Sequence, residues 1–240
     1  MKRFLNIQKN VIRVDPKLKF YEVIEKYGYP VISKEVSDVV YEARRSLEKD
    51  PNANTFRVQR IKGTLKKADG TPSQYNCSKY AYLLDAPFNV SAKCCNYMKK
   101  EPLKRYEKET GRKPIVATMT HESRTRLTAW LKTGCNSFDG KVPMSKPMSF
   151  WTEQDVLQYI VENNLELAPV YGEIQVNEEG KYYLTGEQRT GCMFCMFGCH
   201  LEKEPNRFQR MKHTHPKQYD YCLNKLGLKE VLDYIGVDYE

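Results

Sequence analysis

TGCMFCMFGCH, at residues 190–200, contains the motif that decides how this chain is interpreted, a CxxC formed by Cys192 and Cys195. Glycines on both sides make the stretch typical of a tight knuckle that presents sulfur. A second pair, the adjacent Cys94 and Cys95, lies far earlier in the chain. Two cysteine pairs of this kind can converge on one metal centre, so we predict a cysteine-ligated site.

The adjacency of Cys94 and Cys95 bears on which metal is bound. Neighbouring side chains diverge by half a turn on a strand and by about 100° on a helix. Two adjacent thiolates therefore reach separate irons of a cubane more easily than one small zinc ion. We predict a four-iron four-sulfur cluster (4Fe-4S), with zinc and unligated redox thiols as the alternatives. Three other cysteines are expected to be structural, because isolated thiols behave as small hydrophobes: Cys77, Cys135 and Cys222.

Length and composition indicate a folded protein. The chain has 240 residues, 40% of them hydrophobic and 12% aromatic, which is enough for one sizeable core. No apolar run reaches the length of a signal peptide or a membrane span. We therefore expect a cytoplasmic protein without membrane association. Eight cysteines in a reducing compartment are more often metal ligands than disulfides.

The charge balance predicts an anionic partner. The formal net charge is +9, and the basic residues are spread along the chain without a long tract. Nucleotides, sulfate esters and nucleic acids all fit this charge, so it does not choose among them.

The order of elements is typical of an α/β protein. We expect a strand at residues 10–14, a helix at 19–26 and a second helix capped by Ser33. Residues 51–78 are polar and turn-rich and predict a long excursion. The apolar run at 114–119 predicts a buried strand.

The polar stretch after this run contains a candidate anion site. Ser123 is a natural cap for the helix that follows, and a strand-to-helix junction exposes backbone N–H groups to an anion. Thr152 and Asp155 resemble a capping box of another helix. Residues 173–176 and 181–185 predict a β-hairpin leading to the knuckle, and the tail after Pro205 is expected to be helical.

Four motifs together resemble the phosphoadenosine phosphosulfate (PAPS) reductase and adenylylsulfate reductase family. They are KCCNYMK at 93–99 followed by EPL, Glu122-Ser123-x-x-Arg126, KPMSFWTEQDV at 146–156, and RTGCMFC at 189–195. The likeness extends from about Lys17 onward and is closest to phage- or mobile-element-associated members.

The resemblance implies a single domain with a truncated adenine nucleotide alpha-hydrolase-like (Rossmann-like) sheet, a cysteine knuckle and a helical C-terminal tail. Its parts would be 1–50 for the start of the sheet, 51–90 for the excursion, 91–200 for the cluster and substrate side, and 201–240 for the tail.

The resemblance also implies roles for individual residues. The cluster ligands would be Cys94, Cys95, Cys192 and Cys195, and Lys99 would lie between cluster and substrate. A lysine near a net-negative cluster stabilises it and helps to bind sulfate or phosphate. The substrate or anion contacts would come from Glu122, Ser123, Arg126 and Arg189, with a surface ion pair as the alternative for either arginine.

Two motifs of the family have no counterpart in these residues. The family's phosphate loop, Ser-Gly-Gly-Lys-Asp-Ser, is missing, and the nearest similarity, at 67–71, is in the wrong place. The Glu-Cys-Gly motif that carries the nucleophilic cysteine is missing too. We expect a sulfur-handling protein of adenine nucleotide or sulfonucleotide chemistry that needs a partner to supply the loop. The alternative is an inactive, cluster-bearing protein that binds nucleic acid or a nucleoprotein complex.

Overall fold

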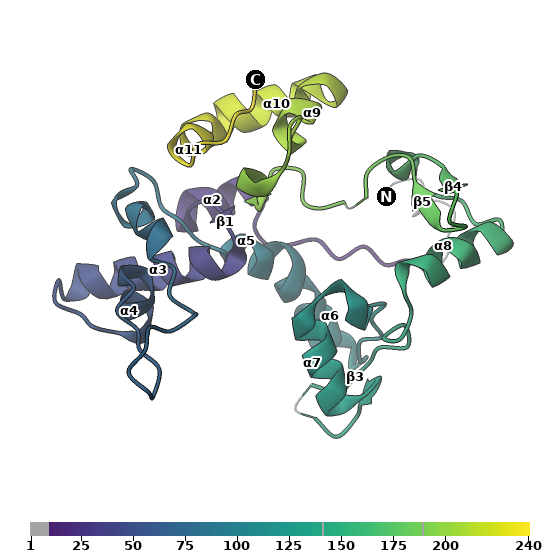
Figure 1. Cartoon of the computed structure of the whole chain (residues 1–240), viewed down its shortest axis with the longest axis horizontal. Coiled ribbons are helices and arrows are strands. Elements are labelled where there is room, and N and C mark those ends of the chain that lie inside the picture. The colour runs from purple at the N-terminus through teal and green to yellow at the C-terminus, as the bar shows by residue number, and fades with distance from the viewer. Residues whose placement is uncertain (1–9, 141, 189) are drawn as a thin grey trace. The chain divides into compact units, whose positions relative to one another are not determined.

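The computed structural model describes residues 10–140, 142–188 and 190–240 (Figure 1). Its packing divides the chain into two compact units. The first combines the residues up to Arg105 with Met193–Glu240, and the second is Tyr106–Cys192. Helices and short strands occur in both units, so the protein is of the mixed α/β class, as predicted.

Helices make up most of the first unit. In its N-terminal part they are α2 (Phe20–Tyr27), α3 (Lys34–Lys49), α4 (Phe56–Lys62), η1 (Ser78–Asp85), α5 (Lys93–Cys95) and the π-helical η2 (Asn96–Lys100). In its C-terminal part they are η5 (Cys199–Leu201), α9 (Arg207–Thr214), α10 (Pro216–Asp220), the π-helical η6 (Tyr221–Lys225) and α11 (Leu228–Tyr234). The helix α6 (Glu101–Thr110) contains the boundary between the units.

One face of α3 forms the base of the first unit's core. Ser33 begins the helix as predicted, because its Oγ accepts a hydrogen bond from the Val36 N–H at 3.1 Å. The buried stripe has helical spacing and consists of Val36, Val39, Val40 and Ala43. Side chains from α4, α9 and α11 complete the same apolar cluster, in which Phe208 and Leu228 are fully buried. Burial of such a side chain stabilises the fold by about 1.5–3 kcal/mol.

A short parallel pairing connects distant parts of the first unit. Strand β1 (Val31–Ile32) pairs with β6 (Met196–Phe197), with Val31 opposite Met196. Just before β1, Tyr29 forms a parallel bridge with Val90, in which Tyr29 N donates to Asn89 O at 2.7 Å. The segment Tyr29–Ile32 is therefore joined both to the residues that precede Cys94 and to those that follow Cys195.

The approach to the paired cysteines is fixed by Arg44 of α3. Its guanidinium donates hydrogen bonds of 2.7–2.9 Å to four backbone carbonyls, those of Leu83, Leu84, Ala86 and Phe88. One side chain thus satisfies carbonyls at the end of η1 and in the irregular segment that follows it. The irregular segment before Cys94 is held against α3 in this way.

The second unit consists of short elements. They are η3 (Thr120–Glu122), α7 (Arg124–Thr133), β2 (Asn136–Ser137), β3 (Met144–Ser145), α8 (Glu153–Glu162), η4 (Pro169–Tyr171), β4 (Ile174–Val176) and β5 (Tyr182–Leu184). The predicted caps are confirmed: Ser123 Oγ accepts from Arg126 N at 3.3 Å, and Thr152 with Asp155 forms the capping box of α8. The predicted hairpin is confirmed as β4 and β5, which pair antiparallel.

Two predicted strands are wrong. Residues 10–14 form no strand, and Ile12 is 60% exposed. The run 114–119 makes only an isolated bridge, Ile115 with Ser145, and Ile115 is 76% exposed. An apolar run stabilises a strand only where a partner strand and a second layer cover it. The strands of the described residues form three two-stranded sheets in place of the single sheet expected.

The segment 51–78, predicted as a long loop because of its polar composition, contains a helix, α4. Thr55 begins α4, and Val58 and Ile61 on its inner face are buried in the core. The helical tail after Pro205 is confirmed as α9, α10, η6 and α11. None of the helices in the described part of the chain is both long and apolar enough to cross a membrane.

Candidate metal centre

The paired cysteines lie at the end of a short helix beside β1. Cys94 and Cys95 form the last turn of α5, which begins soon after the Val90 bridge. The Cys94 side chain is buried, whereas Cys95 is partly exposed. The Cys94 thiol donates a hydrogen bond to the Cys95 sulfur. The two sulfurs therefore lie together, one in the protein and one accessible to solvent.

Cys195 joins this pair from the other end of the first unit. It precedes β6 directly, and its sulfur lies near enough to Cys94 to act on that thiol electrostatically. Cys199, at the start of η5, is buried, and its Sγ donates to the Met196 carbonyl at 3.0 Å. Cys192 is exposed and is the last residue of the second unit. Three of the four predicted ligands, Cys94, Cys95 and Cys195, thus belong to the first unit, and Cys192 to the second.

The two adjacent thiols have opposite acidities. The pKa of Cys94 is strongly raised because its proton is held by the hydrogen bond to Cys95 and because the side chain is buried. The pKa of Cys95 is lowered to about 6 by that same hydrogen bond, with further help from the positive charges of Lys34 and Lys99. Burial raises the pKa of Cys199 to about 11.

This difference in pKa predicts the order in which the cysteines of the metal-free chain are alkylated. The thiolate is the reactive form, so a lowered pKa brings reactivity to lower pH. Cys95 should react with iodoacetamide with a half-maximal rate near pH 6, while Cys94 and Cys199 stay protected through pH 9. Residue-resolved mass spectrometry across this range measures the rates. Equal rates at Cys94 and Cys95, or a Cys95 midpoint above pH 8, contradict the prediction.

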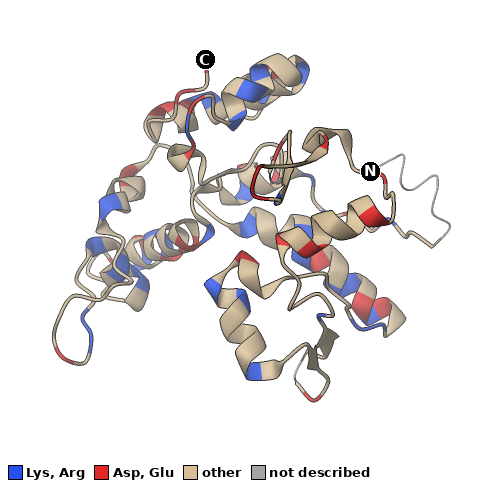
Figure 2. Ribbon diagram, turned by 45° about the vertical axis from the view of Figure 1, so that its right-hand side comes forward, with Lys and Arg blue, Asp and Glu red and all other residues tan. Residues whose placement is uncertain are grey.

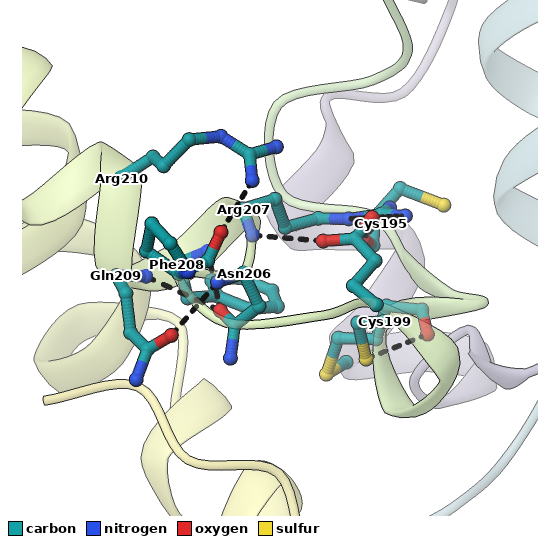
Figure 3. Close-up of polar contacts among 10 residues, drawn as sticks. Cys195, Cys199, Asn206, Arg207, Phe208, Gln209 and Arg210 are labelled. Atoms are coloured by element: carbon teal, nitrogen blue, oxygen red, sulfur yellow. Dashed lines mark hydrogen bonds and ion pairs between the residues drawn. The ribbon is translucent and has the colours of Figure 1, made fainter.

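An arginine that the sequence did not single out holds the knuckle. Arg207, the first residue of α9, donates from Nη1 to the Cys195 carbonyl at 2.8 Å and pairs with Glu202 at 2.5 Å (Figure 3). Asn206 caps the same helix, because its Oδ1 accepts from Phe208 N and Gln209 N. The backbone at Cys195 is therefore tied to the start of α9. The sequence shows only a basic segment here, because the contact depends on how the chain folds back.

Two lysines act on Cys95, and a tyrosine pair fixes the helix that carries one of them. Lys99 is exposed and lies near enough to Cys95 to stabilise its thiolate, as does Lys34 of α3. Tyr97 stacks on Tyr27 of α2 with ring centroids 5.1 Å apart, and the two hydroxyls are 2.5 Å apart. This pair fixes η2 to α2 and so sets where Lys99 emerges.

The predicted anion residues of the second unit lie together. Ser123 caps α7, and Glu122 Oε2 accepts from Met119 N at 3.0 Å. Arg126 forms an ion pair with Glu122, so its guanidinium is already occupied by a carboxylate. Arg189 lies outside the described residues. The i,i+4 spacing of Glu122 and Arg126 was the sequence signal that this pairing could form.

The donor chemistry of the first unit fits a metal–sulfur group. Thiolates are soft ligands suited to iron–sulfur clusters and zinc, and the lowered pKa of Cys95 favours its thiolate form. Within residues 10–140, 142–188 and 190–240, no three His, Cys, Asp or Glu side chains are placed to hold one metal ion. Of the cysteines expected to be structural, Cys77 and Cys222 are buried as predicted, whereas Cys135 is partly exposed.

Comparison with known proteins places this geometry in a family. A model described as the phosphoadenosine phosphosulfate reductase domain matches residues 38–199, well over half of the chain. The matched span contains both cysteine pairs, Lys99 and the Ser123 junction. Comparisons with curated proteins and with solved structures returned no match. The chain therefore belongs to the phosphoadenosine phosphosulfate reductase domain family.

Proposed function

We propose that this chain is an iron–sulfur protein that handles sulfur or adenine sulfonucleotide chemistry. Cys94, Cys95, Cys192 and Cys195 would hold a 4Fe-4S cluster. The observation that carries the proposal is that Cys195 acts electrostatically on the Cys94 thiol, while the segments next to both cysteines pair with Tyr29–Ile32. Cys192 is three residues from Cys195, within about 10 Å of extended chain.

The residues around the cysteines suit a negatively charged centre. A bound cluster would supply a sulfur-rich, redox-capable group. The ammonium of Lys99 offsets negative charge at Cys95 and offers donors to a sulfate or phosphate. Arg207 holds the backbone carbonyl of Cys195 by a hydrogen bond and so restricts where that thiol can lie.

The substrate contacts of the second unit complete the proposal. Glu122, Ser123, Arg126 and Arg189 would face the sulfonucleotide, and Arg126 would exchange Glu122 for the ligand's oxyanion. These 240 residues contain no Ser-Gly-Gly-Lys-Asp-Ser segment. The phosphate contacts would therefore come from other residues or from a partner polypeptide, arranged in the Rossmann-like manner that the resemblance implies.

The experiment is anaerobic purification of the chain, followed by measurement of iron, acid-labile sulfide and zinc per chain. We expect about four irons and four sulfides, with broad absorption near roughly 400 nm. Zinc without sulfide, or no metal, would overturn the cluster. Thermal-shift titration with adenylylsulfate and with ATP then tests the nucleotide, and a stabilisation specific to the sulfonucleotide supports the substrate class.

A second candidate function is binding of nucleic acid without turnover, as in an effector of a phage or mobile element. The observation that favours it is the net charge of +9, with lysines and arginines on many of the helices (Figure 2). Affinity for RNA or DNA that falls steeply with salt would support this function. Absence of binding at low salt would remove it.

A further inference from the structure

Two exposed aromatic rings of the first unit share one buried arginine. Phe56 is the first residue of α4, and Tyr75 lies in the loop that follows this helix (Figure 1). The two residues are 54% and 56% exposed, whereas Arg60 is only 6% exposed. Arg60 Cζ is 5.8 Å from the ring centroid of Phe56 and 5.9 Å from that of Tyr75, and Arg57 Cζ is 5.7 Å from the Phe56 centroid. We call these four residues the aromatic patch.

Hydrogen bonds hold the backbone of the aromatic patch in place. Arg60 Nε donates to the Tyr75 carbonyl at 2.8 Å, and Arg60 Nη2 pairs with Glu35 at 2.5 Å. Cys77 N donates in turn to the Arg60 carbonyl at 2.9 Å. The loop that carries Tyr75 is therefore fixed to α4. Rings on a fixed backbone lose little conformational freedom when a ligand binds, so the patch is preorganised.

The faces of the two rings are not used by the fold. The inner face of α4 supplies the core through Val58 and Ile61, and Phe56 lies outside this buried set. In the part of the chain that the structure describes, no other aromatic ring packs against Phe56 or Tyr75. A single exposed apolar side chain is ordinary, but two rings around one guanidinium offer a surface on which flat groups can stack.

The segment that carries the aromatic patch is strongly basic. Residues 51–79 contain one acidic residue, Asp69, and six basic ones: Arg57, Arg60, Lys62, Lys66, Lys67 and Lys79. The four lysines are exposed, and no carboxylate of the described residues lies within 4.0 Å of their ammonium groups. Asp69 already accepts hydrogen bonds from Thr71 N and Oγ1, at 2.9 and 2.6 Å. The positive charge of this segment is therefore available to an anionic partner.

Ring faces and positive charge together select the class of ligand. Single-stranded nucleic acids are bound by aromatic side chains that stack on bases and by basic side chains that follow the phosphates. A duplex has its base faces covered, and an acidic protein segment would use the charge but leave the rings idle.

We propose that the aromatic patch and the four lysines bind a single-stranded nucleic acid, with bases stacked on Phe56 and Tyr75 and phosphates beside the lysines. This site rests on the second candidate function and gives it a location. It does not require the cluster.

The test is fluorescence anisotropy of the full, anaerobically purified chain with labelled oligo-dT and oligo-U of about twelve nucleotides at low salt. We expect Phe56→Ala/Tyr75→Ala to weaken binding about a hundredfold, about tenfold for each ring removed. Phe56→Trp/Tyr75→Trp keeps two ring faces and should bind within about threefold of the wild type. Binding of either oligomer supports the site, and the tighter one identifies the sugar.

Tyr21→Ala is the matched control for the loss of a ring. Tyr21 lies on α2 of the same unit, is 41% exposed and has Lys19 Nζ 5.9 Å from its ring centroid. It is thus an exposed aromatic residue beside a cation that does not belong to the aromatic patch. Its removal should change the affinity by less than about twofold.

The lysines provide a second measurement. For single strands the slope of log affinity against log salt changes by about 0.7 for each phosphate contact. Lys66→Gln/Lys67→Gln should therefore reduce this slope by about 1.4. Phe56→Ala/Tyr75→Ala should lower the affinity at every salt concentration and leave the slope unchanged, because stacking releases no counterions.

Three results would overturn the site: equal losses in Phe56→Ala/Tyr75→Ala and Tyr21→Ala, a duplex of the same length bound as tightly as the single strand, or displacement of the oligonucleotide by an oligo-glutamate peptide of equal charge. The last would assign the patch to an acidic protein segment. A wild-type chain that binds oligonucleotides independently of the rings loses this site but keeps the second candidate function. A chain that binds none at low salt loses both, and iron and sulfide measured on the same samples test the cluster separately.

Discussion

Replacement of Cys195 by alanine is expected to lower the iron and acid-labile sulfide of the anaerobically purified chain at least about tenfold. Cys195 is the proposed ligand that lies in the C-terminal part of the first unit, where it acts electrostatically on the Cys94 thiol. Its loss removes one of the four thiolates that the proposed cluster requires. Iron and sulfide analysis with the visible spectrum measures the effect.

Cys222→Ala is the matched control. Its thiol is fully buried in the same unit and donates to the Tyr219 carbonyl at 3.2 Å, away from the cysteine pair. This variant should lose some stability because a buried group is removed, and keep its iron. If both variants lose iron equally, the metal depends on general folding and the role of Cys195 as a ligand fails.

Gly28→Ala is expected to lower the free energy of unfolding by roughly 2–6 kcal/mol and to lower the content of the proposed cluster. Gly28 has a φ of +101°, which a side chain disfavours, and an added Cβ would lie 2.2 Å from the backbone of Asn89. That backbone pairs with Tyr29 and leads into Cys94. The chain can relieve this clash only if Gly28 and Asn89 move apart. That movement breaks the hydrogen bond between Tyr29 and Asn89 and shifts the segment that leads into Cys94. Urea denaturation measures the change.

Gly236→Ala is the control that distinguishes the cost of a positive φ from the cost of the clash with Asn89. Gly236 has a φ of +68° in the same unit, and an added Cβ would meet nothing within 4 Å. It should cost only the left-handed backbone penalty, about 1–2 kcal/mol, with iron retained. Similar losses in both variants would show that the Asn89 contact has no particular importance.

The parts of the fold that the sequence predicts are those encoded within a few residues. Ser33, Ser123 and Thr152 each bond to the backbone three residues later, so both partners can be identified in the sequence. The stripe on α3 follows from helical spacing alone. Local rules therefore predict the starts of α3, α7 and α8.

The errors concern contacts between distant residues. The run at 114–119 has the composition of a buried strand, yet Ile115 is largely exposed because only an isolated bridge forms there. Conversely, β1 and β6 are each two residues long, too short for any periodicity, and are defined by pairing across most of the chain. Thr55 begins a helix that the surrounding turn residues concealed.

The residues of the candidate site also fall into two groups, those that the sequence predicts and those that only tertiary structure brings near. The cysteine pairs were predicted because residue type and spacing indicate sulfur ligation, and Lys99 came from the family resemblance. Lys34 and Arg207 approach the cysteines through tertiary structure, one from the start of α3 and one from the start of α9. No sequence pattern around Lys34 or Arg207 indicates that either residue approaches the cysteines, so the sequence alone does not predict these contacts.

The parallel pairing of Tyr29–Ile32 has a consequence for protein synthesis. A ribosome completes this segment and the Cys94 and Cys95 pair long before it reaches Met196, the partner of Val31. Until then the strand lacks its second neighbour and the nascent chain lacks Cys195. Assembly of the proposed cluster, if it uses Cys195, therefore follows translation of the segment around Met196, and a prematurely terminated product would expose the acidic thiol of Cys95 without Cys195.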